Sequence, residues 1–188
     1  DKSDPPHVLD GLCNQLKLLG IVDKKKPTLR WLENKKNNIK IKKPYFIINP
    51  GCSNKHISKR WAPENYAKII DYLSSINITP IILGTTADKK VINKITLITQ
   101  KSINLINKSP LHVIYYLSKK SEGALSNDTG PAHLIANSGC KIHLVLSNFT
   151  KVHQVAPRGR NVTFTQKKNI NDILPEEIIK KMRKMIKR

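Results

Sequence analysis

The sequence predicts an α/β fold in which helices cover both faces of a parallel sheet. From position 44 onward, short continuous apolar segments alternate with longer segments whose apolar residues recur at helical spacing. A continuous apolar run is typical of a strand buried on both faces, as strands in parallel sheets are. The chain has 188 residues, of which 39% are hydrophobic. That is enough for one good core, or for one domain and part of another.

The chain before position 44 does not show this alternation of apolar segments. Apolar residues recur at helical spacing from Val8 to Leu19, and Gly20 follows as a C-terminal stop, so we expect one amphipathic helix. The stretch 28–32 is a candidate edge strand.

The domain boundary is expected near residue 43. The segment 23–43 is rich in lysine and asparagine and is typical of an interdomain linker. We interpret residues 1–43 as the tail of one domain with its linker, and residues 44–188 as the sheet domain. Because the sequence begins with Asp1 rather than methionine, we expect it to be a fragment of a longer protein.

The sheet domain opens with the apolar strand Tyr45 to Ile48, which ends in the turn Asn49-Pro50-Gly51. Pro63 stands near the start of the first helix, where proline loses no hydrogen bond, and Gly84 closes the second strand. The same patterns predict further strands at 79–83, 103–106, 122–126, 142–146 and 161–165. They predict helices at 63–73, 87–98, 109–117, from 131 onward, and at 175–186.

The net charge is strongly positive, at +21, because the chain has 34 Lys and Arg residues and only 13 Asp and Glu residues. Such a balance favours an anionic partner: nucleic acid, an acidic membrane surface or a phosphorylated glycolipid. The alternative is that the abundance of Lys, Asn and Ile reflects an A/T-rich genome. Three features weaken the nucleic-acid interpretation. The lysines are spread along the chain, aromatic residues make up only 5%, and no zinc-finger, RRM, KH or helix-turn-helix signature occurs. No apolar run reaches the roughly 18 residues of a membrane span.

Redox and metal chemistry have no support in the sequence. Cys13, Cys52 and Cys140 are widely separated and no histidine lies at zinc-ligand spacing from them, which is typical of a reduced cytosolic protein. Neither a G-x-x-x-x-G-K-S/T loop nor a G-x-G-x-x-G fingerprint is present, so a P-loop NTPase and a dinucleotide enzyme are not supported. We expect no metal and no cofactor.

The stretch Ala124 to Ala136 is the strongest candidate for a binding site. It predicts the end of a buried strand, a polar turn, and a helix whose first residue is Pro131, with Gly130 as the cap. A glycine there lets a ligand approach the free N–H groups of the first helical turn, and the helix dipole favours an anion. The turn is either a phosphate seat or a well-capped turn without a ligand.

Two more loops follow predicted strands and carry suitable groups. Lys59 and Arg60 can bring an ammonium and a guanidinium to one phosphate, while Trp61 packs the loop down or stacks on a ring. The alternative is a solvated basic loop anchored by a core tryptophan. Asp88 can accept hydrogen bonds from ribose hydroxyls, or it can cap the helix that begins near Ala87.

The central turn adds three candidate side chains. Asp128 and Thr129 place a carboxylate and a hydroxyl beside the free N–H groups, and His133 lies on the helix that follows. Nothing in the sequence places a nucleophile beside this histidine. Asn127 and Asp128 have a second interpretation, in which they only bind the preceding loop.

These motifs occur in the order seen in glycosyltransferase family 9, the ADP-heptose:lipopolysaccharide heptosyltransferases. The matching segments are Phe46–Gly51, Lys59–Ala67, Ile82–Gly84 with Asp88, and Ser126–Leu134. Each lies at the end of a predicted strand, so the ordered set is more specific than any one motif. The chain therefore resembles this family over roughly residues 44–162, and its first helix is similar to the family's passage out of its first domain.

The resemblance implies the GT-B architecture, in which two Rossmann-like domains face a cleft. The C-terminal domain binds the nucleotide-sugar donor, and the N-terminal domain holds most of the acceptor site and the aspartate assigned as general base. This chain is then a donor-binding domain preceded by a remnant of the N-terminal domain. The general base lies outside it, so we expect the isolated chain to bind nucleotide but to transfer nothing.

The resemblance also implies roles for single residues. Lys59 would contact the donor diphosphate, and the turn from Asp128 to Gly130 would hold the diphosphate and nearby sugar groups. Asp88 competes with Ala87 for the position of the family's ribose-binding acid, which leaves that contact open. The expected donor-binding set is Lys59, Arg60, Asp88, Asn127, Asp128, Thr129, Gly130 and His133.

One segment departs from the family. A Gly-Pro-Thr type turn usually follows the last core strand, and this chain has Ser147-Asn148-Phe149-Thr150 there. We expect the acceptor-side loop to differ accordingly.

The predicted function is the transfer of a heptose, or a similar sugar, from an ADP-sugar to a lipopolysaccharide core or lipid A acceptor in a bacterium. We expect a cytoplasmic location, with peripheral contact to the anionic inner membrane as a role for the positive charge, and no nucleic-acid partner. The alternatives are another GT-B nucleotide-sugar enzyme and a basic nucleic-acid-binding α/β module.

Overall fold

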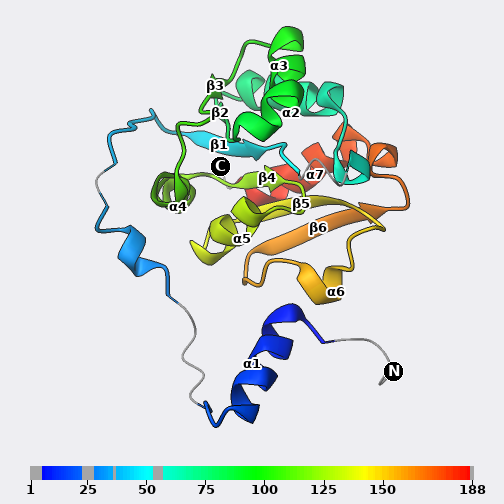
Figure 1. Cartoon of the computed structure of the whole chain (residues 1–188). Helices are drawn as coiled ribbons and strands as arrows, with labels where there is room; N and C mark the ends of the chain where they lie inside the picture. The colour runs from blue at the N-terminus through cyan, green and yellow to red at the C-terminus, as the bar shows by residue number, and fades with distance from the viewer. Residues whose placement is uncertain (1–5, 23–27, 36, 53–56, 187–188) are drawn as a thin grey trace.

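A six-stranded parallel sheet forms the centre of the molecule (Figure 1). The computed structural model describes residues 6–22, 28–35, 37–52 and 57–186. The strands are β1 (Tyr45–Asn49), β2 (Thr79–Ile82), β3 (Ile103–Asn104), β4 (Ala124–Ser126), β5 (Ile142–Ser147) and β6 (Val162–Lys167). The predicted fold class is confirmed, and the predicted strands and helices after position 44 are found with ends that differ by a few residues, whereas the short helix at 152–155 was not expected.

The order of the strands is β3-β2-β1-β4-β5-β6. The chain builds outward from β1 to β3 and then crosses back to place β4 on the other side of β1. Ile47 of β1 is aligned with Ile81 of β2 on one side and with Ala124 of β4 on the other. The order therefore reverses between β1 and β4, which is the place where sheets of this kind bind ligands, outside the carboxyl ends of the strands.

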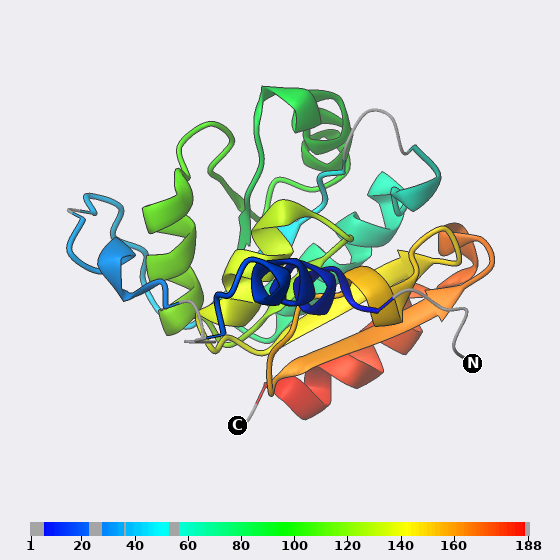
Figure 2. The ribbon, with the colours of Figure 1, turned by 60° about the horizontal axis from the view of Figure 1, so that its bottom comes forward.

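Helices cover both faces of the sheet. The helices are α1 (Val8–Leu18), α2 (Pro63–Ser75), α3 (Lys89–Ile98), α4 (Leu111–Lys120), α5 (Gly130–Asn137), α6 (Val152–Val155) and α7 (Pro175–Met185). Residues of α2, α3 and α7 form one buried cluster against the sheet, and residues of α4 and α5 form a second. Figure 2 shows α7 (red) and α5 (yellow-green) on opposite sides of β5 and β6.

Alternation within β1 explains why its first four residues, 45–48, are all apolar. Phe46 and Ile48 belong to the cluster beneath α2 and α7, whereas Tyr45 and Ile47 belong to the cluster beneath α4 and α5. Successive side chains of a strand point to opposite faces. A strand covered on both sides must therefore be apolar at every position of its buried run.

The candidate edge strand at 28–32 is wrong. Arg30–Leu32 forms a short 3-10 helix, in which the N–H of Leu32 donates to the carbonyl of Leu29 at 2.9 Å. This segment packs against α4, where Glu33 pairs with Lys119 at 2.6 Å. Local turn bonds and this contact replace pairing with the sheet edge.

The first helix stands apart from the core. None of its residues is buried, and its apolar side chains are 43–52% exposed at Val8, Leu9, Leu12 and Leu16. Figure 1 shows α1 (blue) apart from the sheet and its covering helices. An ion pair joins Asp10 to Arg158, and the ring of His7 lies 3.1 Å from the carbonyl of Ala156. No helix in the described ranges is both long and apolar enough to cross a membrane.

Replacing both Leu12 and Leu16 with serine should therefore change the free energy of unfolding little, within about 0.5 kcal/mol, because neither side chain is buried. The matched comparison is Ile70→Ala in α2, a fully buried residue, which should cost about 2–5 kcal/mol. Urea denaturation followed by circular dichroism measures both. A large loss in the α1 variant would show that α1 belongs to the cooperative core.

A buried histidine makes the fold sensitive to acid. His143 on β5 is 1% exposed and lies between the hydroxyls of Thr163 and Thr165, at 2.8 and 2.9 Å. Burial lowers the pKa of His143 from 6.5 to about 4, Lys181 acts in the same direction, and Glu177 opposes it. The unfolded chain therefore binds a proton more readily than the folded chain below pH 6.5.

This difference predicts that stability falls as the pH drops from 6.5 towards 4, by up to about 3 kcal/mol, and that no penalty exists above pH 6.5. Urea denaturation at pH 7, 5.5 and 4 measures the loss. His143→Gln should flatten this dependence, whereas His112→Gln on α4 should not. Parallel losses in the wild type and His143→Gln would contradict the assignment.

Candidate functional site

A groove of about 470 Å³ lies at the carboxyl ends of β1 and β4, where the strand order reverses. Loops that follow β1, β2 and β4 form its walls. The lining residues are Asn49, Gly51, Cys52, Lys59, Thr85, Ala87, Asp88, Asp128, Thr129, Gly130, Pro131 and His133. The structure thus brings three separate predicted loops together at one place.

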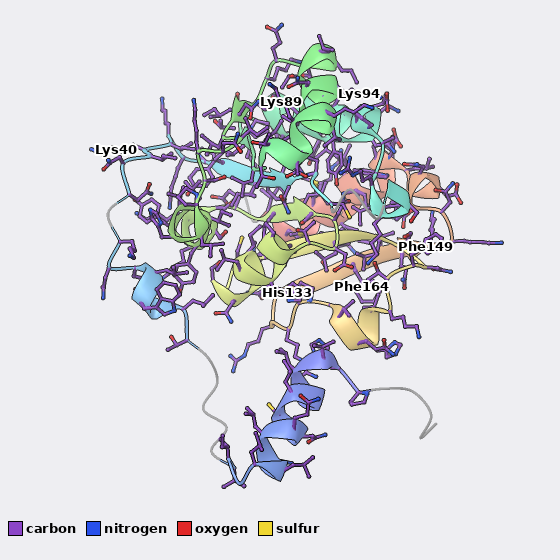
Figure 3. All side chains as sticks on the ribbon, viewed as in Figure 1. Lys40, Lys89, Lys94, His133, Phe149 and Phe164 are labelled. Carbon is purple, nitrogen blue, oxygen red and sulfur yellow. The ribbon has the colours of Figure 1, made fainter. Side chains whose placement is uncertain are left out.

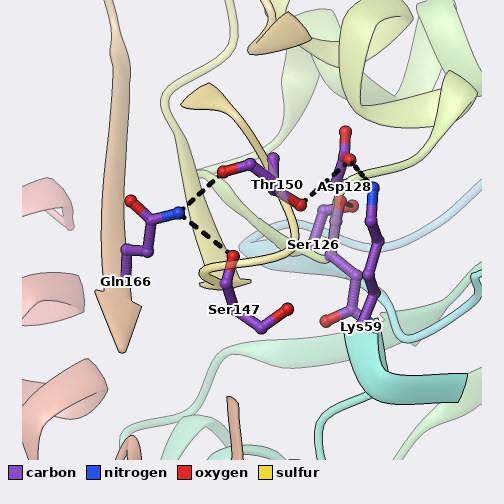
Figure 4. Close-up of polar contacts among 7 residues, drawn as sticks. Lys59, Ser126, Asp128, Ser147, Thr150 and Gln166 are labelled. Atoms are coloured by element: carbon purple, nitrogen blue, oxygen red, sulfur yellow. Dashed lines mark hydrogen bonds and ion pairs between the residues drawn. The ribbon is translucent and has the colours of Figure 1, made fainter. Parts of the chain in front are cut away.

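The groove contains a partly buried ion pair. Lys59, at the end of the 3-10 helix Ile57–Lys59, places its Nζ 2.8 Å from Oδ2 of Asp128. The two side chains are only 17% and 14% exposed. Thr150 donates its hydroxyl to the same oxygen at 3.2 Å (Figure 4). A lysine in this setting is held in one place and is less screened by water than a surface lysine.

The start of α5 differs from the prediction by one residue. The helix begins at Gly130 rather than at Pro131, and Thr129 rather than Gly130 is the N-cap. The side chain of Thr129 makes no capping hydrogen bond, because its hydroxyl instead accepts from Asn49. A Cβ placed on Gly130 would meet nothing within 4 Å. Space is therefore open beside the N–H of Gly130, whereas Pro131 has no N–H and the N–H of Ala132 donates to the carbonyl of Thr129 at 3.1 Å. No side chain caps this helix start, which is a suitable place for an anion.

Asn49 is a site residue that the expected donor-binding set missed. Its side chain is 2% exposed and its amide donates to the hydroxyls of Ser126 and Thr129, at 2.8 Å each. This amide links the ends of β1 and β4. The available signal was an amide at the end of an otherwise apolar strand.

Asn127 is buried and supports the loop after β1. It is fully buried, accepts a hydrogen bond from the hydroxyl of Tyr66 at 2.7 Å, and donates to the carbonyl of Pro50 at 3.0 Å. Burial raises the pKa of Tyr66 above its usual value, so the phenol remains a donor. Of the two interpretations of Asn127, the structure displays the bond to the preceding loop, and Asn127 does not belong to the groove lining.

Arg60 and Trp61 do not belong to the groove lining either. A guanidinium nitrogen of Arg60 donates to the carbonyl of Cys52 at 2.7 Å. Trp61 is 1% exposed, packs edge-on against Tyr66 with ring centroids 5.0 Å apart, and donates to the carbonyl of Ile173 at 3.0 Å. Trp61 therefore packs the loop down. Among the described residues, Lys59 and not Arg60 supplies the cation of the groove.

Asp88 caps a helix and lines the groove as well. Its Oδ2 accepts from the backbone N–H and the hydroxyl of Thr85, at 2.9 and 3.0 Å, in a capping box at the turn that leads into α3. A Cβ on Gly51 would lie 2.6 Å from Oδ1 of Asp88, so the loops after β1 and β2 touch here.

His133 projects from α5 (Figure 3) and is one of the lining residues of the groove. Partial burial lowers the pKa of His133 below its usual value; the charge of Asp128 raises it, and His7 lowers it further. A neutral imidazole at this position can donate one hydrogen bond and accept another. In the described part of the chain, no three His, Cys, Asp or Glu side chains gather in a way that could hold a metal ion.

Comparison with models of known protein families identifies the family to which this chain belongs. The model described as glycosyltransferase family 9 (heptosyltransferase) matches residues 21–171. The chain belongs to this family. The match includes every lining residue of the groove, so the family 9 region and the candidate site coincide.

Known proteins agree with this membership. The family 9 chain is 29% identical over 148 residues to the lipopolysaccharide core heptosyltransferase OpsX of Haemophilus influenzae, covering 73% of this chain and 41% of OpsX. It shares its fold with the ADP-heptose lipopolysaccharide heptosyltransferase II of E. coli (TM-score 0.70, 17% identity, 79% of this chain and 48% of that one). It also shares it with a family 9 glycosyltransferase of Veillonella parvula (TM-score 0.77, 17% identity, 98% and 61%). The chain thus spans about half the length of these proteins.

Two glycines of this family 9 chain should respond differently to alanine. Gly130→Ala should leave the free energy of unfolding within about 0.5 kcal/mol, because the added Cβ enters open space. Gly51→Ala should cost about 1–3 kcal/mol, because the added Cβ would overlap the Asp88 carboxylate. Thermal or urea unfolding distinguishes them; equal effects would mean that the loops after β1 and β2 do not touch in solution.

Proposed function

We propose that this chain is the donor-binding half of a bacterial heptosyltransferase that transfers a heptose, or a similar sugar, from an ADP-sugar to a lipopolysaccharide core acceptor. The observation that carries the proposal is the fixed Lys59 ammonium in the same groove as the open start of α5. The Lys59 ammonium and the positive end of the α5 dipole lie in the same groove there. A diphosphate presents negative charge of the size and spacing that such groups bind.

The chemistry follows from where charge develops. When the bond between sugar and diphosphate breaks, negative charge grows on the departing diphosphate. The Lys59 ammonium and the Gly130 N–H at the start of α5 would stabilise that charge. Lys59 would exchange part of its contact with Asp128 for a phosphate oxygen, and Asp128 would then be available to sugar hydroxyls.

The remaining lining residues have roles that suit their chemistry. The Asp88 carboxylate would accept from the ribose hydroxyls, and Thr129 would contact the diphosphate or the neighbouring sugar. His133 would donate a hydrogen bond to the nucleotide sugar in the groove. Arg60 and Asn127, which were expected as ligands, would act through the loop they hold in place.

The acceptor and its general base belong to another part of the protein in this proposal. Residues 1–43 would be the tail of an N-terminal domain with its linker, and residues 44–188 the Rossmann-like donor domain. The exposed apolar side of α1 supports this division, because the core of residues 44–186 is closed without it. The catalytic base would lie in the N-terminal domain, and the isolated chain would not transfer sugar.

The net charge of +21 supports a cytoplasmic enzyme that contacts the anionic inner membrane at its surface, where phosphorylated lipid acceptors reside. Co-sedimentation with vesicles of phosphatidylglycerol and phosphatidylethanolamine tests this contact. Binding should disappear when the anionic lipid is omitted. Equal binding to neutral vesicles would contradict the electrostatic basis of the contact.

The donor proposal predicts saturable binding of ADP that depends on Lys59. Lys59→Met should weaken binding by roughly 10–100-fold, because a charge-assisted hydrogen bond is lost. Lys119→Met is the matched control, since Lys119 pairs with Glu33 away from the groove. Isothermal titration calorimetry with ADP, UDP and GDP measures affinity and identifies the base.

Two results would point elsewhere. Tighter binding of UDP or GDP would favour a different nucleotide-sugar enzyme of the same architecture. RNA or DNA binding that survives Lys59→Met and Asp128→Ala and falls steeply with salt, without saturable ADP binding, would favour a nucleic-acid module.

A further inference from the structure

We propose that Gln166 and Thr150 are positioning residues of the groove, which hold the Asp128 carboxylate and, through it, the Lys59 ammonium. This inference rests on the proposed function, in which Lys59 contacts the donor diphosphate. It assigns a role to the turn 147–150 that follows β5.

The first link is a clamp on that turn. Gln166 lies on β6, and its Nε2 donates to the carbonyl of Ser147 at 3.0 Å and to the carbonyl of Thr150 at 2.8 Å (Figure 4). The N–H of Thr150 also donates to the carbonyl of Ser147 at 3.0 Å. A single amide nitrogen therefore ties both ends of the turn to the neighbouring strand.

The second link reaches the ion pair. Thr150 is 2% exposed, so its side chain is held inside the structure. Its hydroxyl donates to Oδ2 of Asp128 at 3.2 Å, the oxygen that also accepts from Lys59 at 2.8 Å. Two donors from different loops converge on this oxygen and limit the rotation of the carboxylate. The long lysine side chain then has a fixed partner that determines where its charge lies.

The links form a series from the edge of the sheet to the groove. Gln166 does not belong to the groove lining, and neither does Thr150. Both would therefore act on a ligand only through Asp128 and Lys59. A series of this kind has a recognisable signature: breaking it at either link should have the same effect, and breaking both should add little.

The test uses the chain of 188 residues with two readouts. Thr150→Val removes the hydroxyl and keeps the shape, and Gln166→Met removes the amide donor and keeps the length. Each should weaken ADP binding about 5–10-fold in calorimetry, the double variant should bind no more than about twofold weaker than either, and Thr150→Ser should restore binding. In amine labelling followed by mass spectrometry, Lys59 should react about threefold faster in both variants, while Lys119 should not change.

Thr163→Val is the matched control, because its hydroxyl on β6 bonds to His143 and not to the turn. It should leave both readouts unchanged. Unchanged Lys59 labelling in Thr150→Val and Gln166→Met would overturn the proposal, as would equal effects of Thr163→Val. If the wild type binds no ADP, the proposed function fails, and the labelling of Lys59 alone decides whether the two residues position it.

Discussion

A buried side-chain amide reinforces the pairing of the two strands at whose ends the candidate groove opens. Asn49 ends β1, and its amide donates to hydroxyls at the end of β4 and at the N-cap of α5. Because the amide is buried, leaving it without acceptors would cost the full desolvation of a polar group. Ser126 and Thr129 must therefore stay where they are, and the start of α5 is fixed relative to β1. The position of the Gly130 N–H relative to β1 depends on this contact.

The charges of the groove are arranged around that fixed frame. Lys59 arrives from the loop after β1, Asp128 from the turn after β4 and Thr150 from the turn after β5, and they meet at one carboxylate oxygen. Water is largely excluded from the pair, so its attraction is stronger than that of an exposed pair. The same exclusion makes any rearrangement costly unless a ligand replaces the lost contact. An anion that contacts both Lys59 and the helix start supplies such a replacement.

The sequence allowed the fold and the position of the candidate groove to be predicted, because both depend on local pattern. Continuous apolar runs indicated doubly covered strands, and polar residues directly after these runs had to lie at one edge of a parallel sheet. What no local pattern contains is the direction of a single side chain. Asn127 and Asp128 are neighbours, yet one is buried beneath the loop after β1 and the other lines the groove.

Contacts that depend on the alignment of neighbouring strands could not be predicted from the sequence. Gln166 reaches the turn after β5 because Ser147 is aligned with Lys167 across β5 and β6, and this alignment emerges only from the assembled sheet. The segment 28–32 failed for a related reason: its apolar residues suggested a strand, but Leu32 is buried in a 3-10 turn that packs against α4. Propensity gave way to tertiary contact there.

The charge of the whole chain and the charge of the groove lining differ, so they favour different ligands. The chain carries a net charge of +21, yet among the described lining residues of the groove Lys59 is the only lysine or arginine, and it is accompanied by Asp88 and Asp128. A groove of that composition does not favour a polyanion, because two carboxylates oppose each added negative charge. It favours a ligand with a compact anionic group beside hydroxyls that carboxylates can accept from, which is the composition of a nucleotide sugar. The excess positive charge lies elsewhere on the chain, where it can attract an anionic surface without changing what the groove selects.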